Sequence, residues 1–188
     1  MLRKTLLSLA LCSLALPVAA KPENFAIDVD HTYPSLEFSH MGISLWRGKF
    51  NKTSGSIALD RAAKAGTVDI VVDTKSIDFG HDAMNEHAVG DGWLNTAKFP
   101  TMAYKGKLVF KGDAVDEVKG DLTLMGVTRP VTLKVLSFKC IQHPYYKREA
   151  CGADAEGEIH RGEFGLTKGA DGDAGKVKLK IQVEALKQ

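Results

Sequence analysis

The segment from Val118 to Val135, VKGDLTLMGVTRPVTLKV, constrains the fold more than any other part of the chain. Apolar residues alternate with polar ones on both sides of the Met125-Gly126 pair. The apolar positions are Val118, Leu122, Leu124, Val131, Leu133 and Val135. Alternation with a period of two, interrupted by a glycine turn, is typical of an antiparallel hairpin with one apolar and one polar face. The segment therefore predicts two paired strands that cover an apolar interior.

The same alternation recurs at short intervals along the rest of the chain. The expected strands are Phe25–Asp30, Ser35–His40, Ile43–Phe50, Ser54–Leu59, Thr67–Asp73, Thr101–Phe110, the hairpin of residues 118–135, Ala153–His160 and Lys176–Ala185. Many short strands with turn residues between them indicate a sandwich or a barrel. No segment repeats at a fixed period, which argues against a propeller or a solenoid. We expect an all-β fold, an antiparallel barrel with an apolar interior.

Two segments break the β pattern. Asp60–Gly66 is rich in alanine and predicts a helical turn. In Ile77–Pro100, the stretch His81–Val89 predicts a short helix that ends at Gly90. This second segment is too apolar for a free surface loop, since it contains Phe79, Met84, Trp93, Leu94 and Phe99. Long connections in compact domains usually have a function, so we expect it to close one end of the barrel or to form the wall of a pocket.

The first twenty residues have the pattern of a secretory signal peptide. Arg3 and Lys4 precede an apolar run, and small residues end at Ala20. The apolar run is too short for a membrane-spanning helix. We therefore expect residues 1–20 to be removed and residues 21–188 to form one exported domain.

Charge gives no argument for a nucleic-acid partner. The full chain has 25 Lys+Arg and 23 Asp+Glu, and removal of Arg3 and Lys4 leaves 23 of each. A neutral domain with interspersed signs does not attract nucleic acid or an anionic membrane. Any lipid partner must then be held by shape and by apolar burial.

Two cysteines, Cys140 and Cys151, remain in the exported part of the chain. In an oxidising compartment, such a pair predicts a disulfide that closes the loop IQHPYYKREA. A metal-binding pair or reactive thiols are disfavoured because the spacing matches no zinc pattern.

The chain resembles the YceI-like family in five segments that occur in the same order and spacing. These are HTYPSLEFSHMGISLWRGKFNKTSGSIALD, NEHAVGDGWLNTAKFP, VKGDLTLMGVTRPVTLKV, GEIHRGEFGL and VKLKIQVEA. The resemblance implies an extended, lipocalin-like antiparallel barrel whose interior holds a polyisoprenoid chain or an isoprenoid quinone. It also implies a periplasmic protein with no chemistry of its own.

One departure from the family pattern concerns residues 84–89. The family commonly has an Arg-Asp pair and a second Arg around a histidine, whereas this chain has Met84, Asn85 and Val89 and keeps only His87. A pyrophosphate favours pairing with charged donors. Fewer cations therefore favour a neutral head group, such as a quinone, over a prenyl pyrophosphate.

These considerations predict a set of ligand-binding residues. The tunnel is expected to be lined by Leu36, Phe38, Ile70, Val72, Tyr104 and Phe110, and its lid or mouth by Met84, His87, Trp93 and Leu94. His40 or His87 is expected to contact the polar head group. We expect no cofactor other than the bound isoprenoid lipid or quinone.

Other interpretations stay open at this point. The barrel could be packed shut, as in a stress-response or structural protein. It could also be a hydrolase or redox enzyme, although no nucleophile elbow, phosphate loop or zinc signature occurs. Solvated helix charges explain Asp82 and Glu86 more simply than paired catalytic carboxylates.

His31, beside Asp28 and Asp30, fits a turn capped by carboxylates better than a metal site. Apolar groups on both faces of the Trp46 strand indicate contact with a barrel cap or with a second subunit, so a homodimer is expected.

Overall fold

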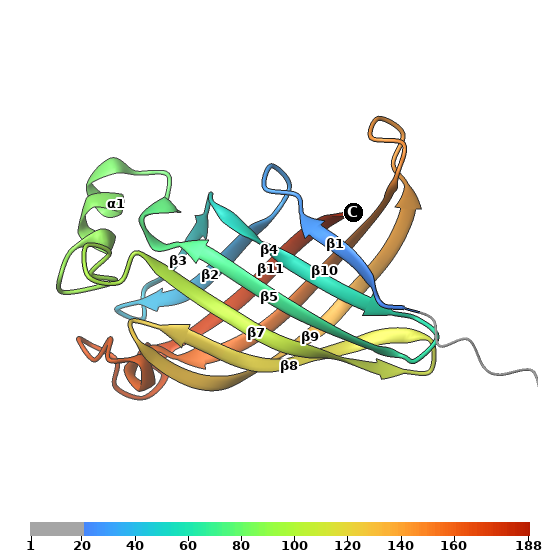
Figure 1. Cartoon of the computed structure of the whole chain (residues 1–188). Coiled ribbons are helices and arrows are strands. Elements are labelled where there is room, and N and C mark those ends of the chain that lie inside the picture. Colours follow the sequence, from blue (N-terminus) through green and yellow to red (C-terminus); the bar gives the residue numbers. More distant parts are fainter. Residues whose placement is uncertain (1–20) are drawn as a thin grey trace, which may run out of the picture.

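The structure, a computed structural model, describes residues 21–188, so the predicted signal peptide lies outside the described residues. It consists of antiparallel strands with one α-helix between β6 and β7 (Figure 1). The strands are β1 (Glu23–Ile27), β2 (Tyr33–His40), β3 (Ser44–Phe50), β4 (Thr53–Asp60), β5 (Ala65–Asp73), β6 (Ile77–Asp78), β7 (Thr101–Lys111), β8 (Ala114–Leu124), β9 (Val127–Gln142), β10 (Glu149–His160) and β11 (Lys176–Lys187), and the helix is α1 (Asp82–Val89). The predicted all-β antiparallel barrel is confirmed.

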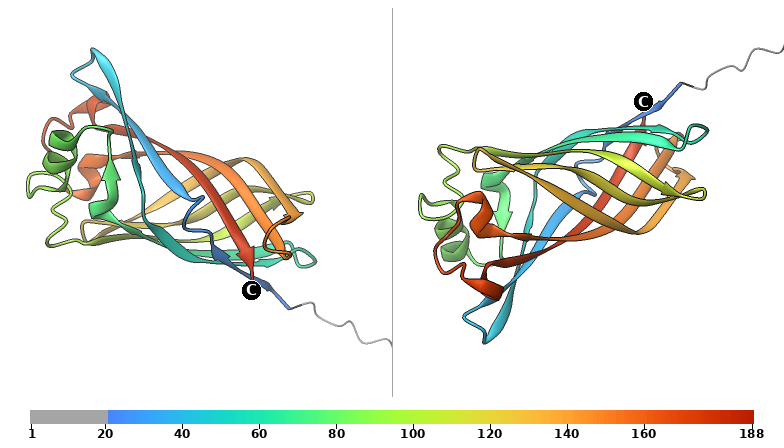
Figure 2. Two further views of the ribbon diagram at one scale, coloured as in Figure 1. Left: turned by 90° about the horizontal axis from the view of Figure 1, so that it is seen from above. Right: turned by 90° about the horizontal axis from the view of Figure 1, so that it is seen from below.

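The barrel closes because β1 pairs with two strands that are far apart in the sequence. Along one edge it pairs with β4, and along the other with the end of β11, where Ile27 lies opposite Ala185. The closed ring therefore has the order β1-β4-β5-β7-β8-β9-β10-β11. β2, β3 and β6 continue from the first half of β11, where Val177 lies opposite Phe38. The sheet thus divides at β11, and the β2–β3 hairpin diverges from the barrel (Figure 2).

The division of the sheet depends on the turn between β1 and β2. The buried carboxylate of Asp28 accepts hydrogen bonds from the backbone N–H of Asp30 and from Nδ1 of His31, each at 3.0 Å. The buried hydroxyl of Thr32 donates to the carbonyl of Glu184 and accepts from its N–H. The expected carboxylate-capped turn is therefore present. It ends β1 at Ile27, three residues earlier than the sequence pattern predicts.

The Asp28–His31 pair gives the fold a specific pH dependence. The hydrogen bond that His31 donates to Asp28 raises the pKa of His31. Burial of Asp28 raises the pKa of its carboxyl, but the hydrogen bonds that it accepts outweigh burial, so that this pKa is lowered. The contribution of His31 to stability is therefore complete below about pH 6.5 and is lost as the pH rises through its folded-state pKa. The contribution of Asp28 is complete above about pH 4 and is lost as the pH falls through its own lowered pKa.

We expect Asp28→Asn to return the pKa of His31 towards about 6.5, the value of an unperturbed histidine. An NMR titration of the His31 ring protons measures this change. The ring signals of His143, on the loop between β9 and β10, serve as an internal control and should be the same in both proteins. An unchanged His31 pKa in the variant would contradict the assigned contact.

Met125 and Gly126 form the two-residue turn between β8 and β9, as predicted. Their φ angles are 51° and 76°. A two-residue turn with positive φ at both positions favours glycine, and its twist matches the twist of the two strands of a β-hairpin. The alternation of the flanking residues and the turn therefore support the same register.

The helical turn predicted for Asp60–Gly66 is wrong. β4 continues to Asp60 and β5 begins at Ala65, and these two residues are paired across the hairpin. The carboxylate of Asp60 accepts a hydrogen bond from the N–H of Ala63 at 2.8 Å. Ladder pairing up to the turn leaves too few residues for a helix, whose first turn is costly to form.

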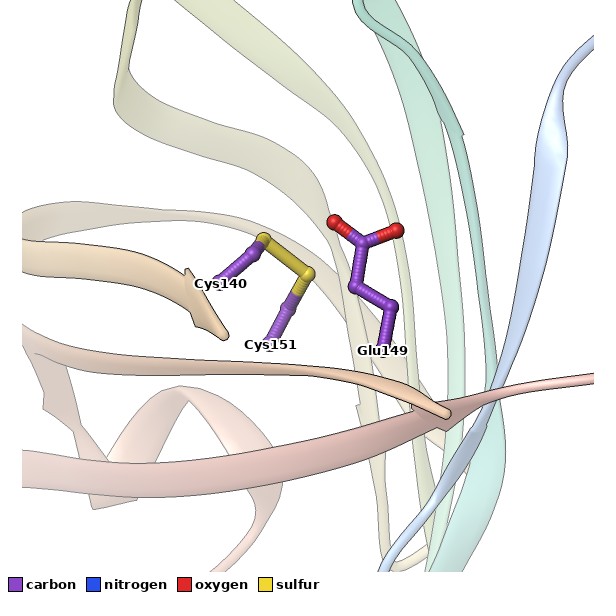
Figure 3. Close-up of side chains that lie close together, drawn as sticks. All are labelled: Cys140, Glu149 and Cys151. Atoms are coloured by element: carbon purple, nitrogen blue, oxygen red, sulfur yellow. A yellow bond between two sulfur atoms is a disulfide. The ribbon is translucent and has the colours of Figure 1, made fainter. Parts of the chain in front are cut away.

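Cys140 and Cys151 form a disulfide between residues that lie opposite each other in β9 and β10 (Figure 3). The bond therefore crosslinks two paired strands, whereas the sequence predicted the closure of a loop. The connection between the strands is only residues 143–148. The guanidinium of Arg61, from the β4–β5 turn, contacts both sulfur atoms and donates to Glu149. This contact ties the β9–β10 hairpin to the other side of the barrel.

Replacing both cysteines with alanine should lower the free energy of unfolding by about 2–3 kcal/mol, since the crosslink restricts the unfolded chain. Urea unfolding followed by far-UV circular dichroism measures the difference. The wild-type protein under reducing conditions should unfold at the same urea concentration as the double variant. Equal stability of the oxidised protein and the variant would show that the crosslink contributes nothing.

Candidate functional site: an apolar cavity in the barrel

The interior of the barrel contains a cavity of about 290 Å³. Strand alternation places one side chain in two on its wall, and contributions come from strands all around the ring. Pockets that bind small molecules commonly measure about 300–1,000 Å³ and have mainly apolar walls. The interior is therefore not filled completely by its own side chains.

Seven of the eleven predicted ligand-binding residues lie on the cavity wall. They are Leu36, Phe38, Ile70, Val72, Trp93, Leu94 and Tyr104. Ile70 packs against all three clusters of buried side chains, which places it near the middle of the barrel. The structure thus brings together residues from β2, β5, β7 and the segment after α1.

Phe110 faces the interior but lies beyond the cavity. It packs against the cluster around Phe25, Leu59 and Cys151 at the end of the barrel that carries the disulfide. Phe25, Leu59 and Cys151 themselves belong to the cavity wall, whereas Phe110 does not. The prediction that Phe110 lines the tunnel is therefore not reproduced by the cavity.

His40, Met84 and His87 are also absent from the cavity wall. His40 stacks on the ring of Trp46, with ring centroids 4.0 Å apart. His87 is exposed, and its Nε2 accepts a hydrogen bond from Nε1 of Trp93 at 2.6 Å. Met84 is half-buried on α1 without reaching the wall. Neither histidine that was predicted to contact the head group therefore faces the cavity in this structure.

The segment 77–100 closes the end of the barrel opposite the disulfide (Figures 1 and 2). Phe79, Ala88, Trp93 and Leu94 contribute to the cavity wall. α1 ends at Gly90, as predicted, where the N–H of Gly90 donates to the carbonyl of His87. The expectation that this segment forms a wall of a pocket is confirmed.

Two polar anchors hold this segment in place. The side chain of Asn85 accepts from the N–H of Phe79 and donates to the carboxylate of Asp78, which joins α1 to β6. At the other end of the segment, the buried hydroxyl of Thr74 donates to the carbonyl of Phe99 at 2.6 Å. Asn85, which departs from the family pattern, therefore has a structural role.

Trp46 lies on the inner face of β3 with Gly48 and Phe50. Its ring contacts Phe38 and Phe79, with centroids 5.9 and 6.2 Å away. A Cβ at Gly48 would lie 2.7 Å from the ring of Phe79, so only glycine allows this approach. Of the two contacts predicted for the Trp46 strand, the structure shows the one with the barrel cap. The homodimer stays a prediction.

Tyr104 supplies a polar group to the middle of the cavity wall, but its hydroxyl is already engaged. It lies 3.0 Å from the carbonyl oxygen of Val118 and 2.9 Å from that of Val131, to which it donates. Burial, together with the charge of Asp121, raises the pKa of Tyr104 to about 12. The phenol is therefore neutral at physiological pH and serves to join β7, β8 and β9.

Thr53 and Arg161 are among the polar residues of the wall that the sequence did not predict. Both are at least nine-tenths buried. Thr53 begins β4, and Arg161 directly follows β10 in the segment GEIHRGEFGL. The sequence did contain one signal, because Arg161 is a charged residue inside a segment that matches the family. No periodicity, however, indicated that its side chain faces the interior.

Two groups of side chains have the spacing of metal ligands within the described residues. One consists of Cys140, Cys151 and Glu149, but its sulfur atoms are bonded to each other (Figure 3). The other consists of Asp28, His31 and Glu184 and belongs to the turn between β1 and β2. In the part of the chain from residue 21 onward, no helix is both long and apolar enough to cross a membrane.

Comparisons with known proteins agree with this architecture. The profile of the YceI-like domain matches residues 25–185. A protein of Shewanella denitrificans named "UPF0312 protein" is 34% identical over the full length of both chains. The crystal structure of BcnA from Burkholderia cenocepacia superposes with a TM-score of 0.68 at 21% identity, covering 84% of this chain and 98% of BcnA. A polyisoprenoid binding domain from Saccharophagus degradans superposes with a TM-score of 0.61 at 17% identity, covering 87% and 98%.

Proposed function

The chain belongs to the YceI-like domain family, and from this premise we propose that it binds a long isoprenoid lipid in the cavity of its barrel. The observation that carries the proposal is the cavity of about 290 Å³ with its apolar wall. The name of the Saccharophagus degradans neighbour, a polyisoprenoid binding domain, supports the same ligand class. The ligand is a polyprenyl chain or an isoprenoid quinone.

The hydrophobic effect accounts for affinity without any reaction. Each buried CH₂ group contributes about 0.8 kcal/mol, so a long tail binds tightly through burial alone. Tyr104 and His87 already have structural partners: the hydroxyl of Tyr104 lies within hydrogen-bond distance of two backbone carbonyl oxygens, and His87 accepts from Trp93. We therefore assign the protein a binding function without catalysis.

The proposed biological role is to carry or store the lipid in the periplasm. A long isoprenoid is insoluble in water, so it needs a protein cover to cross an aqueous compartment. The pattern of a signal peptide in residues 1–20 supports export.

A series of isoprenoid alcohols with increasing tail length tests this function. Protein freed of lipid by organic extraction and refolded should bind each longer alcohol more tightly, until the tail fills the cavity and the affinity levels off. Isothermal titration calorimetry measures the affinity, and a negative heat-capacity change should accompany apolar burial. Affinity that is independent of tail length would contradict the proposal.

A further inference from the structure

Two buried polar atoms on the cavity wall lack a hydrogen-bond partner. They are Oγ1 of Thr53 and Nε of Arg161, and they are the buried side-chain nitrogen and oxygen atoms of residues 21–188 that remain unsatisfied. Thr53 is 3% exposed and Arg161 is 8% exposed. A buried polar atom without a partner costs about 1–3 kcal/mol, and more when the group is charged, so each such atom needs an explanation.

The remaining donors of Arg161 hold a loop together. Nη1 donates to the carbonyls of Leu166 and Lys168 at 2.9 and 2.8 Å, and Nη2 donates to that of Gly169 at 2.5 Å. These contacts engage three of the five N–H groups of the guanidinium. They fix the position of the side chain and leave Nε–H free to donate.

The charge of Arg161 is also uncompensated at this position. Its partners are neutral carbonyls, and its guanidinium lies 5.4 Å from the centre of the Trp93 ring. Arg161 carries a charge, whereas the other described residues of the cavity wall are apolar or uncharged. Burial lowers the pKa of Arg161, but an arginine remains protonated in proteins. A hydrogen-bond acceptor, above all an anionic one, would therefore be stabilised beside it.

Thr53 and Arg161 lie at the same end of the barrel. Arg161 contacts Trp93, which follows α1. Thr53 is paired with Val72, whose cluster includes Ala88 and Leu94 of the same segment. The segment after β10 and the α1 segment lie at the same end of the barrel (Figures 1 and 2). The opposite end, around Phe25 and Cys151, also belongs to the cavity wall, and its side chains are apolar.

We infer that the ligand is an amphiphile with a hydrogen-bond-accepting oxygen at its head, and that Arg161 and Thr53 bind this head at the α1 end while the tail extends towards the disulfide. This inference rests on the proposed function and specifies the ligand class of the same cavity. It replaces His40 and His87 as the contacts of the head group. The oxygen belongs to a carbonyl, as in a quinone, or to a phosphate.

Three probes that share one tail test the inference: geranylgeranyl phosphate, geranylgeranylacetone and the parent diterpene hydrocarbon. Wild-type protein, freed of lipid, should bind both oxygen-bearing probes more tightly than the hydrocarbon. Arg161→Met should weaken binding of both by about ten- to a hundredfold, the loss expected for a hydrogen bond to a charged donor. Arg161→Lys should recover part of the affinity for the phosphate only, because it keeps the charge but loses the planar donor.

Thr53→Val provides a second variant that conserves shape. Since the hydroxyl has no partner within the protein, this variant should fold with at least wild-type stability. It should weaken binding of the oxygen-bearing probes by about three- to tenfold and leave hydrocarbon binding unchanged.

The outcomes separate this inference from the proposed function. Binding of all three probes with equal affinity, unaffected by either variant, would overturn the inference and leave the lipid-binding function intact. If Arg161→Met weakened the binding of all three probes equally, Arg161 would serve only to hold the loop of residues 166–169. This result would also overturn the inference. Failure of the wild-type protein to bind any probe would overturn both.

Discussion

Replacing Ile70 with Asp should abolish lipid uptake. Ile70 lies on the cavity wall in β5 and packs against all three buried clusters. A carboxylate at this position places an unpaired charge against the tail, at a cost far greater than the gain from burying several CH₂ groups. The measurement is the amount of lipid extracted per mole of folded protein.

The neighbouring residue provides the matched control. Val71 is 37% exposed and points to the outer face of the same strand, so Val71→Asp should keep a full load of lipid. Ile70→Trp adds volume to the cavity without a charge and should lower the load even if Ile70→Asp folds poorly. A full load in folded Ile70→Asp and Ile70→Trp would mean that lipid binds elsewhere.

Replacing Phe25 with Ala should lower the free energy of unfolding by about 3–5 kcal/mol, the usual cost of removing a buried phenylalanine side chain. Phe25 is 1% exposed and lies on β1, the strand that closes the barrel between β4 and β11. For a domain of this size, the melting temperature should fall by about 6–20 °C.

Asn24→Ala is the control for this change, because Asn24 is the adjacent residue of β1 and is exposed. It should alter the melting temperature only slightly. Differential scanning calorimetry of both variants measures the contrast. A melting temperature for Phe25→Ala equal to that of the control would show that the closing strand contributes little to stability.

Alternation of side chains made the strands and their inner faces predictable from the sequence. Leu36, Phe38, Ile70, Val72 and Tyr104 were all assigned to the interior, and they lie on the cavity wall. Local patterns suffice here because neighbouring residues of a strand point to opposite sides. The turn at Met125 and Gly126 was predictable for the same reason, since its conformation depends on two adjacent residues.

Position along the barrel axis was less predictable. Phe110 has the alternation of an inward-facing residue, but it packs against the Phe25 cluster and is not part of the cavity wall. His40 also shares the face of Phe38, yet Trp46 of the neighbouring strand stacks on its ring. Alternation determines the side of the sheet but not how far the cavity extends along it. That extent depends on side chains from strands remote in the sequence.

The polar end of the cavity depends on tertiary contacts alone. Arg161 follows the last residue of β10, where alternation ends, and its burial requires the carbonyls of residues 166–169 and the ring of Trp93. Thr53 opens β4 and resembles any solvent-facing threonine in the sequence. Closure by β1 was equally hidden, because it joins the two ends of the described chain.

Native mass spectrometry of the protein, expressed with its own first twenty residues and purified without detergent, tests the central claim most directly. We expect one isoprenoid lipid per chain, identified by solvent extraction of the same sample. The Val71→Asp protein should carry the same lipid, and the Ile70→Asp protein should carry none. A wild-type protein of bare mass, under conditions that preserve other lipid complexes, would contradict the account.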